Sequence, residues 1–290
     1  MISISRRSAS LYLILIIALF SGACSRLDVL NATAGSSGYR RVADQAYGSA
    51  PRQKLDIYIP TDKTANTDVV IFFYGGRWQT GDKNDYRFAA AGLTANGVIS
   101  VIPDYRLYPQ VDWRDFIGDA AAAYRWVEKN IAAHGGNPRR IFLMGHSAGA
   151  HITAMVALDQ SLRRQAGSEI NPCGMIGLAG PYDFLPFADA DVKQVFHSAE
   201  RALETQPVFY ADRTDPNILL LTGDADTSVK PRNTYRLAQT LQDRGGKAQV
   251  IVYKGVGHAE ILIALAPRLK FIAPVLSDAL NFIRKTECEP

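Results

Sequence analysis

Short apolar runs alternate with longer amphipathic segments along most of the chain. Such runs predict strands buried on both faces, and segments with apolar residues three and four positions apart predict helices. The predicted strands cover residues 41–47, 54–59, 69–74, 98–103, 140–144, 175–180, 217–223 and 247–253, and the predicted helices 86–97, 113–136, 148–158, 232–246 and 267–285. This alternation favours a single α/β domain, in which helices cover both faces of a mostly parallel sheet.

The stretch from 181 to 216 breaks this alternation, because it is irregular and rich in aromatic residues. Long connections inside a compact fold usually have a function. We therefore expect a short, lid-like insertion that covers a pocket. A surface loop packed only for stability would have the same composition and stays open as an alternative.

The first 23 residues differ in character from the rest of the chain. Arg6 and Arg7 are followed by the apolar residues 11–20, and Ser-Gly-Ala then precedes Cys24. This order predicts a secretory signal over residues 1–23. Its apolar run is shorter than the roughly 20 residues that a membrane-spanning helix requires.

Cys24 occupies the position of the modified cysteine in bacterial lipoproteins. Ser21 stands where such signals usually have Leu, and Ser21-x-Ala23 equally fits ordinary signal peptidase cleavage, which would leave Cys24 without lipid. We expect an exported protein, anchored to the membrane through lipidated Cys24 and facing the periplasm. Without the lipid it would be soluble in the periplasm or secreted. The small and polar residues over 24–39 predict a tether, and 40–290 the folded domain.

Charge and cysteine content limit the partners of the folded part. The chain has 32 Lys and Arg against 28 Asp and Glu, and loss of Arg6 and Arg7 with the signal leaves 30 against 28. A nearly neutral domain without a Lys/Arg-rich run argues against a nucleic-acid partner.

Cys173 and Cys288 would lie in an oxidising compartment, where they could form a disulfide or remain two free thiols. No C-x-x-C pair or His/Cys cluster indicates a metal site.

The segment "IFLMGHSAGA" (141–150) contains Gly145-His146-Ser147-Ala148-Gly149, which fits G-x-S-x-G. It lies between a predicted strand and a predicted helix. A sharp turn there strains the backbone of the central residue, requires small neighbours and exposes the serine hydroxyl, as a nucleophile needs. The pentapeptide also arises by chance in a chain with 23 glycines. Other residues must therefore decide whether this pentapeptide holds a nucleophilic serine.

Acidic and histidine side chains follow two later strands at the same predicted edge of the sheet. Asp224 and Asp226 follow the strand 217–223, and His258 follows the strand 247–253. The chain order Ser, acid, His is that of the α/β-hydrolases. We expect Ser147 as nucleophile, His258 as the base that takes its proton, and an aspartate that orients the imidazole.

The choice of the acid and the choice of the base both depend on where the residues lie in the loops after their strands. Asp226 is preferred to Asp224, because it leaves more residues for the chain to turn after the strand. Among the five histidines, only His258 follows the last strand in a glycine-flanked loop; the others are His134, His146, His151 and His197. His146 is expected to point away from the serine, and His151 to be packed or to line the pocket.

Attack of the serine on a carbonyl also needs donors for the negative oxygen of the tetrahedral intermediate. The backbone N–H of Ala148 is one candidate, since it directly follows the nucleophile. The loop "YGGRW" (74–78) after the strand 69–74 is the other, because its glycines let backbone amides turn towards a substrate. Such donors lower a barrier by about 3 to 4 kcal/mol. Gly75-Gly76 could also be a plain turn.

Taken together, these motifs resemble a known family. "YGGRW", "VIPDYRLYP", "GGNPRRIFLMGHSAGAH" and "GDADTSV…GHAE" are similar to those of the hormone-sensitive-lipase-like carboxylesterases. The resemblance is narrower to the branch with feruloyl/acetyl-xylan esterase-like and kynurenine formamidase-like enzymes, and covers about residues 40–285. It implies an eight-stranded α/β-hydrolase fold, no cofactor, and hydrolysis of small esters through an acyl-enzyme.

By the same resemblance, Gly76, Arg77 and Ala148 match the oxyanion-hole positions. Tyr74 stands where the family usually has His, so a phenol or nothing must anchor the loop. Arg77 replaces the third glycine of the lipase-type pattern, and its side chain would crowd or charge the pocket. Both departures, with the short covering segment, favour short acyl groups.

The sequence therefore predicts an exported serine carboxylesterase that acts on small-molecule esters. Two alternatives remain. One is amide hydrolysis by an arylformamidase or a peptidase-type enzyme. The other is a non-catalytic binding module on the same fold.

Overall fold

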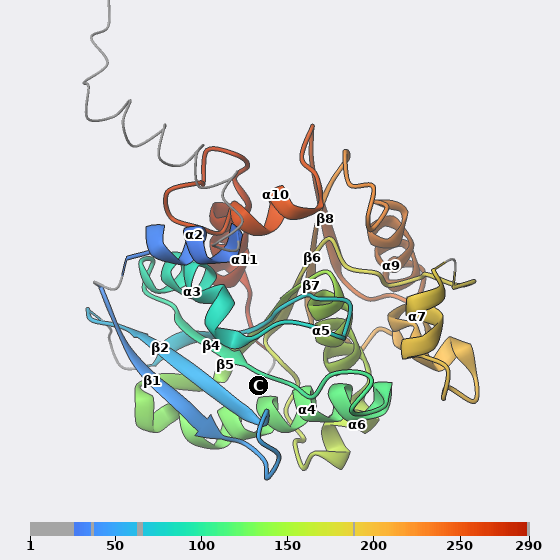
Figure 1. Cartoon of the computed structure of the whole chain (residues 1–290), viewed down its shortest axis with the longest axis horizontal. Coiled ribbons are helices and arrows are strands. Elements are labelled where there is room, and N and C mark those ends of the chain that lie inside the picture. Colours follow the sequence, from blue (N-terminus) through green and yellow to red (C-terminus); the bar gives the residue numbers. More distant parts are fainter. Residues whose placement is uncertain (1–25, 36–37, 63–65, 188, 289–290) are drawn as a thin grey trace, which may run out of the picture.

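A central sheet organises the molecule (Figure 1). The computed structural model describes residues 26–35, 38–62, 66–187 and 189–288. Its strands are β1 (Tyr39–Ala46), β2 (Lys54–Pro60), β3 (Thr67–Phe73), β4 (Ile99–Pro103), β5 (Gly136–His146), β6 (Gly174–Leu178), β7 (Asn217–Gly223) and β8 (Ala248–Tyr253). They form one eight-stranded sheet in the order β1-β2-β4-β3-β5-β6-β7-β8. Only the pairs that involve β2 are antiparallel, which confirms the predicted, mostly parallel sheet.

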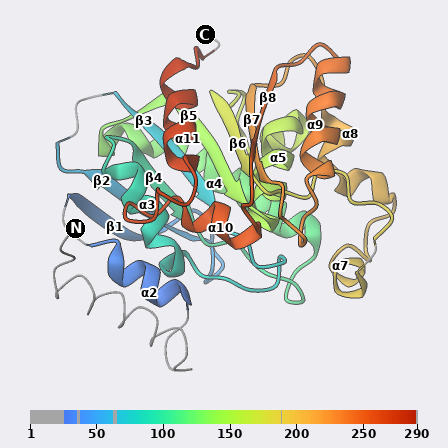
Figure 2. The same ribbon diagram turned by 90° about the horizontal axis from the view of Figure 1, so that it is seen from above.

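Helices cover both faces of this sheet (Figures 1 and 2). The α-helices are α2 (Arg26–Thr33), α3 (Arg87–Thr94), α4 (Trp113–Asn130), α5 (Ala148–Leu158), α6 (Gln160–Gln165), α7 (Ala190–Val195), α8 (Pro207–Tyr210), α9 (Arg232–Asp243), α10 (His258–Ile263) and α11 (Val275–Lys285), and the 3₁₀ helices are η1 (Lys83–Tyr86), η2 (Ile131–His134) and η3 (Ala202–Thr205). Helices α3 and α11 pack on one face, and α4, α5 and α9 on the other. Every residue of α5 is buried, so the helix that follows the serine turn lies in the core.

Two helices have other bounds in the structure than the sequence predicts, because a glycine and a proline change the backbone conformation there. The helix predicted over 113–136 ends at Asn130 and continues as η2, and Gly135 then takes a left-handed φ of 84° that leads directly into β5. The helix predicted over 267–285 begins only at Val275. Pro274 precedes it as the N-cap, and proline has no N–H with which to continue a preceding helix.

The predicted tether is partly wrong, because α2 packs on the domain. The side-chain amide of Asn31 donates to the carbonyl oxygens of Asn84 and Asp85 at 3.0 and 2.9 Å. Its oxygen accepts from the N–H of Phe88 at 3.1 Å, which satisfies a donor at the start of α3 that has no partner within the helix. Leu30 is buried as well. These contacts hold α2 against η1 and α3.

The predicted signal over 1–23 and Cys24 lie outside the described residues. Within the part that is described, none of the helices combines the length and the apolar character that crossing a bilayer demands.

A disulfide joins Cys173 to Cys288, which decides between the two alternatives left open by the sequence. Their Cα atoms are 4.7 Å apart, and the bond connects residues 115 positions apart. Beside it, the guanidinium of Arg140 donates to the carbonyl oxygens of Ile283 and Thr286 at the end of α11. The C-terminal helix is therefore attached to the start of β5 and to the residue before β6.

The insertion over 181–216 carries α7, η3 and α8, and aromatic packing holds it to the domain. The rings of Phe184 and Phe196 contact the Trp78 ring at centroid distances of 6.1 and 4.9 Å. His151 of α5 connects these parts: its Nδ1 accepts from the indole N–H of Trp78 at 3.2 Å, and its Nε2 donates to the carbonyl oxygen of Thr205 at 2.8 Å. The insertion is thus attached to the helix that follows the serine.

Burial lowers the pKa of His151 to about 4, although its hydrogen bond to Thr205 acts in the opposite direction. The folded protein therefore holds this ring neutral. The unfolded chain protonates it below about pH 6.5. Between these two values the unfolded state binds the additional proton, so stability falls as the pH falls.

We predict that His151→Gln removes part of the acid sensitivity of the fold. Between pH 7.5 and pH 4.5 the wild type should lose about 2 to 3 kcal/mol more free energy of unfolding than the variant. Denaturant titrations at both pH values measure this difference. An equal loss in the two proteins would contradict the assignment of a neutral, buried His151.

Candidate active site

Ser147 lies at the sharp turn between β5 and α5, with φ at 56°. Such a φ is unfavourable for a residue with a side chain, and the surroundings must hold it. A Cβ on Gly145 would lie 2.3 Å from the carbonyl oxygen of Gly149, and a Cβ on Gly149 would lie 2.1 Å from that of Phe73. Both glycines of the motif are therefore required by packing, as the sequence predicts.

The structure brings the side chains of Ser147, Asp226 and His258 together. His258 Nε2 lies 2.9 Å from Ser147 Oγ, and its Nδ1 lies 2.8 Å from Asp226 Oδ2. They come from the carboxyl ends of β5, β7 and β8. Asp224, the alternative acid, instead accepts from the N–H of Gly255 at 2.6 Å and supports the turn before His258.

Hydrogen bonds determine the charge of Asp226. Burial alone would raise the pKa of this carboxyl, but the hydrogen bond from His258 and the N–H groups of Val229 and Ser228 hold it below its usual value. Both of these N–H groups lie 2.9 Å from Oδ1. The acid is ionised at neutral pH and accepts the Nδ1 proton of His258. Nε2 of the neutral ring is then free to accept the proton of Ser147.

His146 contacts this group in a way that sequence reasoning missed. Its Nε2 lies 2.9 Å from the carbonyl oxygen of His258, and the two rings are 4.7 Å apart. Burial, together with the neighbouring His258, lowers the pKa of His146 to about 3. The neutral ring therefore donates from Nε2 to the His258 backbone. Its position before the serine was visible in the sequence, but its contact with a residue 112 positions away was not.

The backbone near Ser147 offers donors at two places. Ala148 is the first residue of α5, so its N–H has no partner within the helix. In the loop after β3, Gly76, Arg77 and Trp78 have φ values of 126°, 55° and 61°, which turn the chain sharply. Arg77 and Ala148 line the same cavity as Ser147, whereas Gly76 is not part of its lining.

Tyr74 anchors this loop through its phenol. Its hydroxyl donates to Asp104 Oδ1 at 2.6 Å and accepts from the Arg52 guanidinium at 2.8 Å. Tyr105 donates to the Tyr74 carbonyl oxygen at 2.9 Å, and the rings of Tyr86 and Tyr105 stack on that of Tyr74. Burial, followed by the neighbouring Tyr105 and Asp104, raises the pKa of Tyr74 well above its ordinary value. The phenol therefore stays protonated and remains a donor.

A cavity of about 340 Å³ opens beside Ser147, and the insertion forms one of its walls. Its lining combines aromatic and apolar side chains with three cations and is made up of Arg77, Trp78, Ser147, Ala148, Pro181, Phe184, Pro186, Phe187, Asp189, Val192, Thr227, Ser228, Val229, Lys230, Arg232 and Asn233. Arg77 pairs with Asp189 at 2.8 Å, which ties the loop after β3 to the segment before α7. Residues of the insertion therefore contribute to the lining of the cavity.

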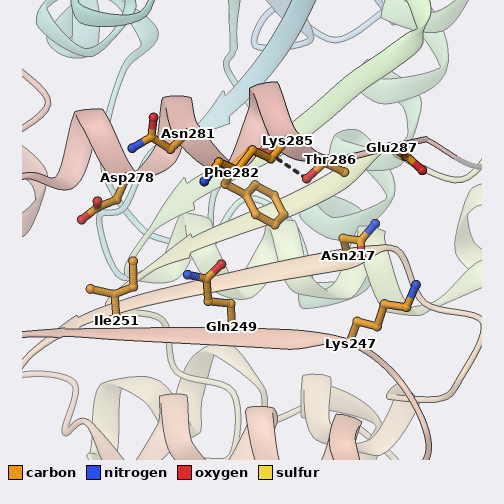
Figure 3. Close-up of a pocket in the computed structure, with 10 residues that line it drawn as sticks. All are labelled: Asn217, Lys247, Gln249, Ile251, Asp278, Asn281, Phe282, Lys285, Thr286 and Glu287. Carbon is orange, nitrogen blue, oxygen red and sulfur yellow. Dashed lines mark hydrogen bonds between the residues drawn. The ribbon is translucent and has the colours of Figure 1, made fainter.

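A larger groove of about 510 Å³ lies between α11 and β8 (Figure 3). Most of its side chains are polar, and Asn217 and Lys247 place it at the start of β7 and β8. In parallel sheets, ligands bind at the carboxyl ends of the strands, which is the opposite edge. The cavity at Ser147 is therefore the candidate active site.

The remaining histidines lie apart from this site. His197 is exposed and its Nδ1 bonds to the carbonyl oxygen of Gln194, while His134 ends η2. Neither residue lines the cavity. Among the described residues, no group of three or more His, Cys, Asp or Glu side chains is arranged to hold a metal ion.

Comparisons with known proteins agree with this architecture. Residues 55–241 match the family model BD-FAE. An isoprenylcysteine alpha-carbonyl methylesterase of Arabidopsis thaliana is 31% identical over 239 residues, which cover 75% of this chain and 56% of that protein. A kynurenine formamidase of Danio rerio is 30% identical over 165 residues, covering 57% of this chain and 54% of that protein. The chain thus spans about half the length of these curated relatives.

The fold is shared with a solved carbohydrate esterase from gut microbiota, with a TM-score of 0.75 and 21% sequence identity. The alignment covers 87% of this chain and 98% of that one. The family model and the fold confirm the resemblance inferred from the motifs. This chain therefore belongs to the BD-FAE family and has the α/β-hydrolase fold.

Proposed function

We propose that the protein is a serine carboxylesterase that hydrolyses small carboxylic esters through an acyl-enzyme. The observation that carries this proposal is the 2.9 Å contact between Ser147 Oγ and His258 Nε2 at the edge of the cavity. This contact lets the base remove the serine proton as the oxygen attacks a carbonyl carbon.

The geometry supports each proton transfer of such a reaction. Ser147 attacks the ester carbonyl, and its proton moves to His258 Nε2, while ionised Asp226 stabilises the imidazolium that forms. The N–H groups of Ala148 and Arg77, two residues that line the cavity with Ser147, would receive the negative oxygen of the intermediate. His258 then gives its proton to the leaving alcohol. A water molecule, activated by the same base, attacks the acyl-enzyme and regenerates the free serine.

Amide hydrolysis is the second candidate. The relative named a kynurenine formamidase favours it, since that name denotes hydrolysis of a formamide. The methylesterase relatives favour ester hydrolysis instead. The same three side chains serve both reactions, so the substrate must be distinguished by kinetics.

We predict that Ser147→Ala lowers the hydrolysis of 4-nitrophenyl acetate by about 10⁴-fold or more, because the nucleophile is lost. The matched control is Ser228→Ala, which removes another hydroxyl from the cavity lining and should leave most of the activity. Circular dichroism should show the same fold in all three proteins. Unchanged turnover in Ser147→Ala would reject this serine as the nucleophile. A wild-type serine that is inert to a fluorophosphonate probe would favour a non-catalytic binding module.

We further predict a preference for short acyl groups. The cavity is about 340 Å³, and the Arg77 side chain, paired with Asp189, takes part of its wall. In a series of 4-nitrophenyl esters, kcat/KM should be highest for acetate to butyrate and fall for longer chains. Formanilide in the same panel tests the amide alternative, and a higher kcat/KM for it than for phenyl acetate would replace the esterase proposal. Rising kcat/KM up to decanoate would contradict the proposed acyl length.

We also propose that the protein is exported and anchored through a lipid on Cys24. The charged start, the apolar run and the small residues before Cys24 support a secretory signal. The Cys173–Cys288 disulfide is compatible with an oxidising compartment.

Cys24→Ser should move the protein from the membrane fraction to the soluble fraction of a bacterial expression host, because the site of lipid attachment is lost. Mass spectrometry of the membrane-extracted wild type should show the added lipid on the mature N-terminus. Identical fractionation of both proteins, with no added mass on the wild type, would reject lipidation.

A further inference from the structure

One wall of the cavity at Ser147 carries cations that have no anionic partner in the described part of the chain. Lys230 and Arg232 both line this cavity, are exposed, and form no ion pair with any of the residues that the structure describes. Arg77 differs, because Asp189 and Asp191 neutralise it at 2.8 and 3.7 Å. The charged groups of the lining are therefore Arg77, Asp189, Lys230 and Arg232, and their sum is positive.

Backbone contacts hold this wall in a defined place relative to the reacting serine. The Asp226 carboxylate accepts the N–H groups of Ser228 and Val229 at 2.9 Å each, and Lys230 follows directly. Arg232 is the first residue of α9, whose N-terminal end adds positive potential to the wall.

The insertion also holds the wall that carries Lys230 and Arg232, through hydrogen bonds to Asn233. Asn233 Oδ1 accepts the N–H groups of Tyr182 and Asp183 at 3.1 and 3.0 Å. The wall with Lys230 and Arg232 is thus attached both to the acid that orients the base and to the cover of the cavity. Both long side chains line the same cavity as Ser147.

The lining also has an apolar part, to which Trp78, Phe184 and Phe187 contribute. A small ester with an apolar body and one negative group would match both parts of this surface. We propose that the site selects esters that carry a carboxylate, which Lys230 and Arg232 bind while Ser147 attacks the ester carbonyl. This inference rests on the proposed esterase function and names its substrate class.

The expected preference is moderate, because both cations are exposed to water. Charge pairs in such positions contribute little individually and weaken as salt screens them. Lys230→Gln and Arg232→Gln should each lower kcat/KM for a carboxylate-bearing ester by about threefold, and the double variant by about tenfold. The effect on a neutral ester of the same length should stay below about twofold.

Arg236→Gln is the matched control. It removes the same charge from the same helix one turn later, but Arg236 pairs with Asp183 at 3.2 Å and does not line the cavity. Its kcat/KM values should match those of the wild type for charged and neutral esters.

Two pairs of substrates distinguish which side of the ester carries the carboxylate. For the acyl side, methyl hydrogen glutarate is compared with methyl pentanoate, and for the alcohol side, 4-acetoxybenzoate with its methyl ester. Hydrolysis is followed by pH-stat titration at low and at high NaCl, and the rate of Ser147→Ala is subtracted as background. We expect the wild type to prefer the charged member of at least one pair, a preference that high salt reduces and the double variant loses.

Ser147-dependent hydrolysis of both neutral esters, with no preference for a charged partner in either pair, would overturn this proposal and leave the esterase function standing. A preference that the double variant retains would also overturn it, since the carboxylate would then be bound elsewhere. Absence of any Ser147-dependent hydrolysis in all four substrates would instead reject the esterase function.

Discussion

The left-handed backbone of Ser147 is the constraint on which the rest of the site depends. A φ of 56° at this residue ends β5 and begins α5 within one turn, and so projects the hydroxyl above the sheet. Close packing holds the turn, because Gly149 lies against the carbonyl oxygen of Phe73 and Gly145 lies against Gly149. Strand β3, the neighbour of β5, therefore fixes both the serine and the loop that follows Phe73.

The other parts of the site are held by polar contacts that are mostly buried. Tyr74, Asp104 and Arg52 connect the loop after β3 to the ends of β2 and β4. Neutral His146 donates to the backbone carbonyl oxygen of His258, while Asp226 holds the Nδ1 of its ring. Each of these groups is satisfied by a partner, which is what makes buried polar groups rigid rather than destabilising.

The insertion and the wall with Lys230 and Arg232 determine which side chains line the cavity and which charge it has. His151 links the core helix α5 to Trp78 and to the insertion, so the cover of the cavity is part of the folded domain. The Arg77–Asp189 pair joins the loop after β3 to the insertion, while Lys230 and Arg232 add positive charge to the cavity lining. The lining of the cavity and its charge thus come from several segments of the chain.

Local patterns in the sequence determined the eight strands, the serine turn and the positions at which Asp226 and His258 follow their strands. They did so because apolar periodicity and glycine chemistry act over a few residues, and because the carboxyl ends of parallel strands share one edge. The helix α2 was not foreseen, since the contacts of Asn31 with Asn84, Asp85 and Phe88 join residues more than 50 positions apart.

Only the tertiary structure brought Asp226 to His258 and Asp224 to Gly255, paired Cys173 with Cys288 and brought His146 to the backbone of His258. The charge of the cavity likewise emerged only when the partners of its cations were known. A residue type limits what a side chain can donate, accept or bond. Which partner it meets depends on chain segments that only folding brings side by side.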